Sequence, residues 1–162
     1  MLLFLRTQWQ RFFSLNISPV SQLLFVGGQF QPEQWPQIHA VGVRAVLSMQ
    51  AERIDQFSEP LPERFHRLEV RDFHPPSLEQ LAEGVAFIAA AHAEGLPVFV
   101  HCHAGVGRAP IMAAAYLVAS EGLSSREALR LIQMARPIIR PNLLQLARLR
   151  EYEARLSNGT MF

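Results

Sequence analysis

The sequence contains a single cysteine, Cys102, among its 162 residues. One cysteine cannot form an internal disulfide, and it also excludes a four-cysteine zinc site. Neither sign of charge is in excess, because 15 basic residues stand against 14 acidic ones and give a net charge of +1 with histidine neutral. The strongly basic surface of a nucleic-acid-binding protein is therefore not expected. These absences favour a reduced, cytoplasmic, globular protein that binds no nucleic acid.

Long hydrophobic runs are also missing, and no apolar run is long enough to span a bilayer. The apolar start of the chain contains Arg6 and Arg11 and has no small-residue cleavage site of the kind that ends a secretory leader. We expect residues 1–14 to form an arm or helix that packs on the domain. The alternative is an amphipathic helix in weak contact with a membrane surface. Its apolar side would contain Leu2, Leu3, Leu5, Trp9, Phe12 and Phe13.

The sequence does have enough apolar residues for one sizeable core, with 49% apolar and 18% charged residues in a chain of single-domain length. We expect one domain over residues 15–156, followed by a short tail at 157–162. Patterning predicts strands at residues 23–26, 43–47, 65–70 and 98–100, with a turn at Gly27-Gly28. Helices are expected at 32–41, from the capping box at Ser77 to Gly95, at 111–119, from the capping box at Ser124, and from Asn142 onward. This alternation predicts a single α/β domain with a central, mostly parallel, twisted sheet flanked by helices.

The chain leaves the last predicted strand through residues 101–108, HCHAGVGR. In α/β folds ligands bind at the carboxyl ends of central strands, so chemistry is expected here. Two glycines allow backbone torsions closed to other residues, and successive N–H groups can then point inward as an anion-binding nest. The following helix adds its positive N-terminal end, and Arg108 supplies a planar fork that matches two phosphate oxygens. These positive groups should favour the thiolate of Cys102, a nucleophile directed at phosphorus.

A phosphate ester attacked by a thiolate loses an oxygen leaving group that needs a proton. Asp72 is the predicted donor, because it follows the third strand at the same edge of the sheet, on a loop stiffened by Pro75-Pro76. The other acidic residues of the preceding loop, Asp55, Glu59 and Glu63, are expected to be solvated.

Several residues allow a second interpretation. His101, Cys102 and His103 could bind a metal, but adjacent side chains at a strand end point apart, so neither a metal nor another cofactor is expected. His101 is expected to orient the loop by hydrogen bonding and His103 to line the rim of the pocket. Asn142 is either a helix cap or a side chain that braces a loop.

The pattern Cys-x5-Arg after an apolar strand and a histidine, with Asp-x-x-Pro-Pro about 30 residues upstream, resembles the cysteine-dependent dual-specificity phosphatases. The segments LFVGGQ and ARPIIRPN and the strand at 43–47 resemble the same family, and the likeness spans roughly residues 15–156. The resemblance implies that Cys102 is the nucleophile, Arg108 the phosphate-binding side chain and Asp72 the general acid. It implies an oxyanion-binding loop whose backbone comes from His103, Ala104, Gly105, Val106 and Gly107.

The sequence departs from the commonest family pattern at Ala109, where a serine or threonine usually follows the arginine. Some glucan phosphatases are similar in carrying Arg-Ala-Pro, so a phosphoglucan is an alternative substrate. A phosphoinositide or phospholipid is another. A catalytically weak phosphoprotein-binding module is the alternative from another functional class. We expect a phosphatase of phosphotyrosine and phosphoserine/threonine in proteins, and the sequence predicts no oligomeric state.

Overall fold

The structure, a computed structural model, describes residues 1–6 and 14–160 of the chain. Residues 2–6 are helical, and the side chains of Leu2 and Leu5 are exposed. The part of the predicted amphipathic arm that includes Trp9, Phe12 and Phe13 lies outside the described residues. No helix in the described ranges has the length and apolar character needed to cross a membrane.

The core of the fold is a five-stranded sheet with the strand order β1-β2-β5-β3-β4. Its strands are β1 (Ile17–Pro19), β2 (Leu24–Gly28), β3 (Ala45–Ser48), β4 (Arg64–Arg67) and β5 (Val98–Cys102). β1 runs antiparallel to β2, and the other neighbouring pairs are parallel. The prediction of an α/β fold with a mostly parallel sheet is thus confirmed, with β5 at its centre.

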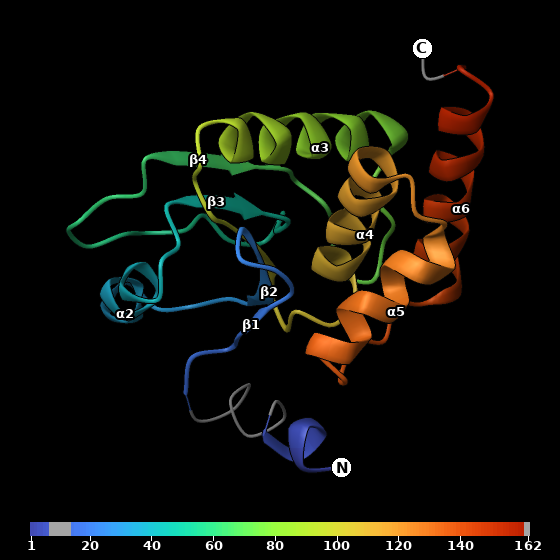
Figure 1. Cartoon of the computed structure of the whole chain (residues 1–162). Coiled ribbons are helices and arrows are strands. Elements are labelled where there is room, and N and C mark those ends of the chain that lie inside the picture. The colour runs from blue at the N-terminus through green and yellow to red at the C-terminus, as the bar shows by residue number, and fades with distance from the viewer. Residues whose placement is uncertain (7–13, 161–162) are drawn as a thin grey trace.

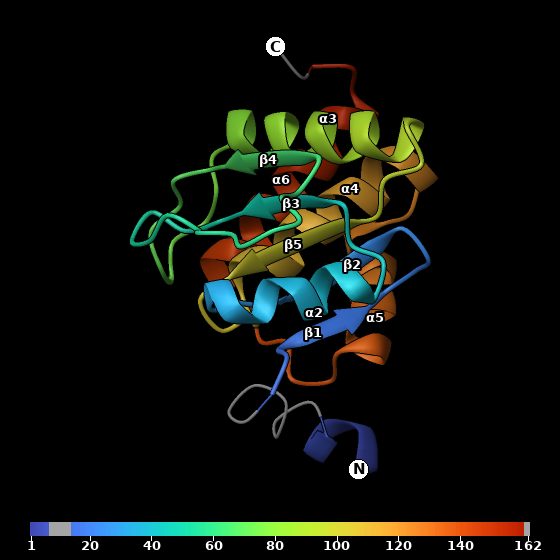
Figure 2. The ribbon, with the colours of Figure 1, turned by 90° about the vertical axis from the view of Figure 1, so that its left-hand side faces the viewer.

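Helices cover both faces of the sheet (Figures 1 and 2). They are η1 (Pro32–Gln34), α2 (Trp35–Ala40), α3 (Leu78–Ala93), α4 (Arg108–Glu121), α5 (Ser125–Ala135) and α6 (Leu143–Ser157). Figure 2 shows α2 in front of the sheet, while α3 and α4 pack on the other face and α5 and α6 pack against α4. Ser77 and Ser124 each form the capping box that their sequence spacing predicts, and Asn142, which was expected to be a cap or a brace, also forms one.

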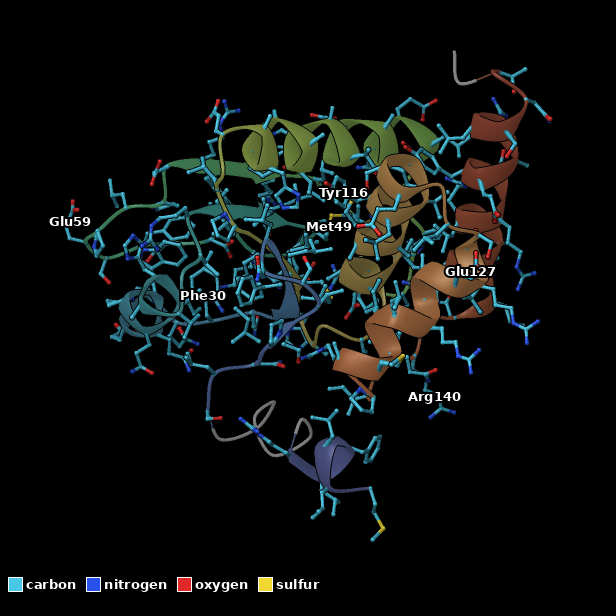
Figure 3. All side chains as sticks on the ribbon, viewed as in Figure 1. Phe30, Met49, Glu59, Tyr116, Glu127 and Arg140 are labelled. Atoms are coloured by element: carbon cyan, nitrogen blue, oxygen red, sulfur yellow. The ribbon has the colours of Figure 1, made fainter. Side chains whose placement is uncertain are left out.

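The continuous apolar run of β5 follows from this burial on both faces. Val98 and Val100 join the core beneath α3 and α4, whereas Phe99 joins the smaller core beneath α2. Phe30, labelled in Figure 3, and Trp35 fill that smaller core, and their ring centroids lie 6.0 Å apart. Strand β5 is therefore fixed from both sides, which gives its carboxyl end a defined position.

Two local predictions are wrong, and one strand was not predicted. Gly27 and Gly28 belong to β2 rather than to a turn. Glycine is needed at Gly27 for space, since a Cβ there would lie only 1.9 Å from the backbone oxygen of Asn16. The third predicted strand ends at Arg67 instead of residue 70, and the chain then turns toward the site. The short edge strand β1 was not predicted, since three residues carry too little periodicity.

Candidate active site

The site lies at the carboxyl ends of three parallel strands. Cys102 is the last residue of β5, lies opposite Gly28 of β2, and follows His101, which lies opposite Ser48 of β3. Its side chain is nearly buried, at 3% exposure. The loop 103–107 then leads directly into α4 at Arg108. The thiol therefore lies at the base of a recess formed by a strand end, a loop and a helix N-terminus.

The loop presents its amides inward because its carbonyls are held from outside. All five carbonyls accept hydrogen bonds from donors beyond the loop: His103 O from Gln29 N (3.0 Å), Ala104 O from Arg136 Nη2 (3.0 Å), Gly105 O from Arg136 Nε (2.6 Å), Val106 O from Arg140 N (2.7 Å) and Gly107 O from Ile111 N (3.2 Å). None of the loop's own N–H groups has an acceptor within residues 1–6 and 14–160. This arrangement is an anion-binding nest above the thiol.

The two loop glycines are required for different reasons. Gly105 has φ +69°, in the left-handed region, and a Cβ there would lie 2.3 Å from the backbone of Gly27. Gly107 has φ −122° and ψ −79°, so the left-handed torsion occurs at Gly105 and not at Gly107. At Gly107 the constraint is space, since a Cβ would lie 2.9 Å from Oε1 of Gln145.

Arg108 is fully buried at 1% exposure, and its guanidinium is fixed before any ligand binds. Nη1 donates to Glu52 (2.8 Å) and to the carbonyls of Val70 (2.8 Å) and Met49 (3.2 Å), and Nη2 donates to Glu52 (2.7 Å). Its buried Nε has no hydrogen-bond partner in the part of the chain that the structure describes. A buried guanidinium N–H without an acceptor is costly, so this donor suits an oxygen of a bound anion.

The Arg108–Glu52 pair changes the titration of both groups. The side-chain hydrogen bonds from Arg108 lower the pKa of Glu52 from 4.5 to about 2. Burial alone would lower the pKa of Arg108, but Glu52 and the charge at Cys102 raise it above its ordinary value. Arg108 is charged at any physiological pH, so the role of Glu52 is to hold the guanidinium in one orientation.

Glu52→Gln is expected to destabilise the protein near neutral pH and to reduce the pH dependence of its stability. The folded carboxylate has a pKa of about 2 against an ordinary 4.5, so its contribution is complete above pH 4.5 and is lost as pH falls toward 2. The difference in unfolding free energy between wild type and variant, measured with denaturant across this range, should shrink in acid. A difference that stays constant with pH would contradict this role, and exposed Glu33→Gln is the control.

Asp72 contacts the same guanidinium from the loop that connects β4 to α3. Its Oδ1 lies 3.1 Å from Nη2 of Arg108 and accepts a hydrogen bond from Phe73 N at 3.0 Å. The Asp72 side chain is 47% exposed, so it borders both the buried anion site and solvent. Phe73 has φ +63°, an uncommon torsion for a residue with a side chain, which indicates a constrained turn at this position.

The first turns of α6 brace this loop. Asn142 Nδ2 donates to Phe73 O at 2.7 Å, while its Oδ1 accepts from Gln145 N at 3.0 Å, so Asn142 is both a helix cap and a loop brace. Gln145 Nε2 donates to His74 O at 3.3 Å, and Arg148 Nη1 donates to Pro76 O at 2.7 Å. The position of Asp72 is thus set by side chains of α6 as well as by the two prolines.

The predicted solvation of Asp55 is wrong, whereas Glu59 and Glu63 are exposed as expected. Asp55 is buried, and its Oδ2 lies 2.5 Å from Nε2 of fully buried His101. The other ring nitrogen, Nδ1, faces Cys102 O at 3.4 Å. Phe30 and Phe99 enclose the imidazole, with ring centroids 5.3 and 5.4 Å away. His101 therefore orients the backbone behind Cys102, as predicted, and Asp55 holds it.

Asp55→Ala is expected to lower the free energy of unfolding by about 1–3 kcal/mol, because it leaves a buried imidazole nitrogen without its partner. Asp55→Asn keeps an acceptor oxygen at the same position and should cost less. Denaturant unfolding of both variants measures the difference. A loss in Asp55→Ala no larger than that of an exposed control such as Glu59→Ala would contradict the buried bond.

A pocket of about 450 Å³ lies beside the recess and is lined by Ala51, Glu52, Arg71, Asp72 and His103. His103 thus lies at the rim, as predicted. Within the described ranges, no group of three histidine, cysteine, aspartate or glutamate side chains could hold a metal ion. The recess combines a thiol, inward-facing amides, a fixed arginine and a carboxyl group, which is suited to attack on a bound tetrahedral anion.

Sequence reasoning missed three residues that build this site: Glu52, Arg136 and Gln145. Each is distant in sequence from the loop that it supports, and Arg136 lies 31 positions from Gly105. Arg136 lies in the segment ARPIIRPN, which resembles the family, and this resemblance was the available signal for Arg136. Gln145 lies three residues after Asn142, so the capping-box spacing Asn-x-x-Gln was an available signal, whereas Glu52 has no comparable local signal.

Comparisons with known proteins agree with this geometry. The family model "Dual specificity phosphatase, catalytic domain" matches residues 24–155. The mouse protein phosphatase Slingshot homolog 3 is 34% identical over 137 residues, which are 83% of this chain and 20% of that protein. Human dual specificity protein phosphatase 12 is 33% identical over 122 residues, covering 74% of this chain and 36% of the relative. The chain thus spans about a fifth to a third of these relatives.

Solved structures show the same fold. PTPMT1 in complex with PI(5)P superimposes with a TM-score of 0.80 at 25% identity, covering 89% of this chain and 98% of that one. Tk-PTP in its active form gives 0.75 at 26% identity, covering 87% and 98%. Since the family model runs through nearly the whole described fold and the relatives exceed 30% identity, the chain belongs to the dual-specificity phosphatase family, as its sequence resemblance implied.

Proposed function

We propose that the chain hydrolyses phosphate monoesters of phosphorylated proteins through a phosphocysteine intermediate. The observation that carries this proposal is the recess above Cys102, where five inward amides and the unpaired Nε of Arg108 surround a buried thiol. Such donors stabilise negative charge on a phosphoryl group as it is transferred.

The reaction takes place in two steps. The thiolate of Cys102 attacks phosphorus and forms the S–P bond, while the P–O bond breaks and the leaving oxygen takes a proton from Asp72. Asp72, now a carboxylate, accepts a proton from a water molecule whose oxygen attacks phosphorus. The S–P bond then breaks, which releases inorganic phosphate and restores the thiolate.

A protein substrate is favoured because the Slingshot relative and dual specificity protein phosphatase 12 are both named as protein phosphatases. A phosphoinositide is the second candidate, because the PTPMT1 structure was solved with PI(5)P. Phosphoglucan hydrolysis and phosphoprotein binding without catalysis are the remaining alternatives.

Phosphate release from four substrates separates these functions: a phosphotyrosine peptide, a phosphothreonine peptide, a soluble PI(5)P and a phosphoglucan. We expect the highest kcat/KM for the phosphopeptides. Turnover confined to PI(5)P or to the glucan would replace the proposed substrate class. Binding of phosphopeptides with no turnover of any substrate would favour the binding module.

Ala109 makes the second step slow in this proposal. It is fully buried beside the recess and offers no hydroxyl to the departing thiolate. A hydrogen bond to a charged group contributes about 1.5–3 kcal/mol, or roughly 10- to 150-fold in rate. We therefore expect a pre-steady-state burst with a good leaving group, which Ala109→Ser should shrink while raising kcat.

Ala113→Ser, one turn further along α4 and equally buried, is the matched control. No burst in wild type, with kcat unchanged in Ala109→Ser, would contradict this expectation.

A further inference from the structure

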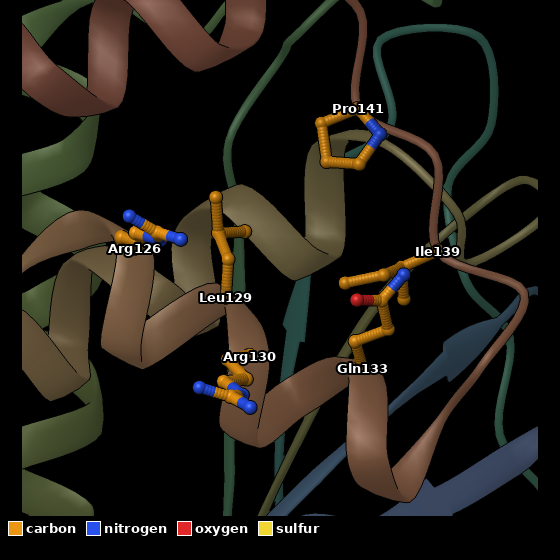
Figure 4. Close-up of a pocket in the computed structure, with 6 residues that line it drawn as sticks. All are labelled: Arg126, Leu129, Arg130, Gln133, Ile139 and Pro141. Carbon is orange, nitrogen blue, oxygen red and sulfur yellow. The ribbon is translucent and has the colours of Figure 1, made fainter.

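A groove of about 430 Å³ separates α5 from the segment that leads into α6 (Figure 4). Its lining residues are Arg126, Leu129, Arg130, Gln133, Ile139 and Pro141. The four residues on α5 recur at helical spacing and share one face of the helix. Ile139 and Pro141 form the opposite wall, and Ile139 is only 9% exposed. The groove thus has a partly apolar lining with two guanidinium groups along one side.

The arginines of this groove are not neutralised by the protein. Arg126 and Arg130 are exposed and make no hydrogen bond or ion pair with any described residue. Arg140, which extends outward beside α5 in Figure 3, is likewise exposed, and its side chain has no partner in the described ranges. The neighbouring Glu127 keeps its negative charge but forms no ion pair with either arginine in the described ranges, because its carboxylate is turned toward the helix start, where it accepts hydrogen bonds from Ser124 Oγ (2.7 Å) and Ser124 N (2.9 Å).

The segment that forms one wall of the groove is hydrogen-bonded to the loop of the candidate active site. Arg140 N donates to Val106 O of the anion-binding loop at 2.7 Å, and Pro141 of the groove wall follows directly. At the other end of this segment, Arg136 Nε donates to Gly105 O at 2.6 Å. The segment 136–141 therefore contacts the outer side of the anion-binding loop and also lines the groove at Ile139 and Pro141, which makes the two sites neighbours in the fold.

We propose that this groove binds an acidic segment of the phosphorylated protein, with at least two carboxylates and an adjacent apolar side chain. The proposal rests on the proposed phosphatase function and adds a preference among its protein substrates. Arginine forks form paired hydrogen bonds with carboxylates, and all 15 basic residues of the chain are arginine. A peptide fits better than a membrane surface, because the charges border a groove whose opposite wall contains the nearly buried Ile139.

The test compares an acidic phosphopeptide with a neutral one. The acidic segment lies before or after the phosphorylated residue, and glutamine replaces each of its acidic residues in the neutral peptide. We expect wild type to prefer the acidic peptide by about 10-fold in kcat/KM, through KM, since each exposed pair contributes modestly. The double variant Arg126→Gln/Arg130→Gln should lose this preference and keep its turnover of an aryl phosphate. The variant Arg150→Gln/Arg155→Gln changes net charge equally on α6 and should retain the preference.

Binding of the unphosphorylated acidic peptide, measured by fluorescence anisotropy, tests the groove without catalysis. Binding by wild type that weakens in the groove variant supports the proposal even if no phosphopeptide is hydrolysed, in which case the phosphatase function alone fails. Hydrolysis of phosphopeptides without an acidic preference or peptide binding overturns the groove proposal alone. Binding of anionic phospholipid vesicles that needs Arg126 and Arg130, with no peptide effect, would also overturn it in favour of a membrane site.

Discussion

Cys102→Ser is expected to reduce turnover of an aryl phosphate by a factor on the order of 10⁴–10⁶, as removal of a covalent nucleophile does. A serine hydroxyl is not ionised at neutral pH, so the inward amides would still bind phosphate but no S–P bond could form. The side chain is nearly buried at 3% exposure and the two residues are similar in size, so the fold should persist. Circular dichroism and thermal unfolding check that point. Substantial activity in Cys102→Ser would remove the phosphocysteine mechanism.

Arg108→Lys is the matched variant, because it removes anion binding and leaves the nucleophile in place. A lysine keeps the charge but cannot reproduce the two bonds to Glu52 together with a donor for the phosphate. Calorimetric titration with tungstate or phosphate should detect binding by Cys102→Ser and little or none by Arg108→Lys. Equal anion affinity in both variants would show that the loop amides alone hold the phosphoryl group.

Much of the fold follows from local sequence patterns. The run Val98-Phe99-Val100 predicts a strand buried on both faces, and its residues do alternate between the two cores. The capping boxes at Ser77 and Ser124 predict helix starts because side chain and backbone satisfy each other within four residues. The loop 101–108 is likewise local, so its cradle could be expected from glycine spacing and the following helix.

The features that could not be predicted depend on contacts between distant segments. Asp55 lies in a polar loop and has no local signal of burial, yet it pairs with His101 across 46 positions. Glu52 pairs with Arg108 across 56 positions, and the sequence around it resembles any exposed acidic loop. Gly27 and Gly28 have the composition of a turn, but the close approach of Asn16 explains why β2 needs glycine there.

These distant contacts are also what hold the candidate catalytic groups in position. Glu52 fixes Arg108, Arg136 fixes the loop carbonyls, and Asn142 fixes the turn that carries Asp72. Local pattern therefore identifies the groups that do chemistry, while long-range packing sets their geometry. The function of a residue can be proposed from the local sequence pattern, but the residue that holds it in position can be identified only from the folded structure.

Asp72→Asn is expected to reduce kcat by about 10²–10⁴-fold for substrates with poor leaving groups and far less for good ones. The carboxyl group protonates the departing oxygen, and this matters only when that oxygen is basic. A series of aryl phosphates with leaving groups of increasing basicity measures the effect as the slope of log kcat against leaving-group basicity. The slope should steepen in Asp72→Asn. The loss of rate at alkaline pH that a required protonated acid causes should also disappear in the variant.

The contact between Asp72 and Arg108 offers an alternative, because Asp72 could act only by positioning the guanidinium, at 3.1 Å. Glu52→Gln distinguishes the two roles, since it weakens the hold on Arg108 but leaves the proton donor in place. Its loss should be uniform across the leaving-group series and should appear mainly in KM for phosphate-bearing substrates. Asp55 cannot replace Asp72 as the acid, because it is buried against His101 and away from the pocket lined by Asp72. A uniform loss in Asp72→Asn, with no change in slope, would therefore assign Asp72 to positioning and leave water as the proton source.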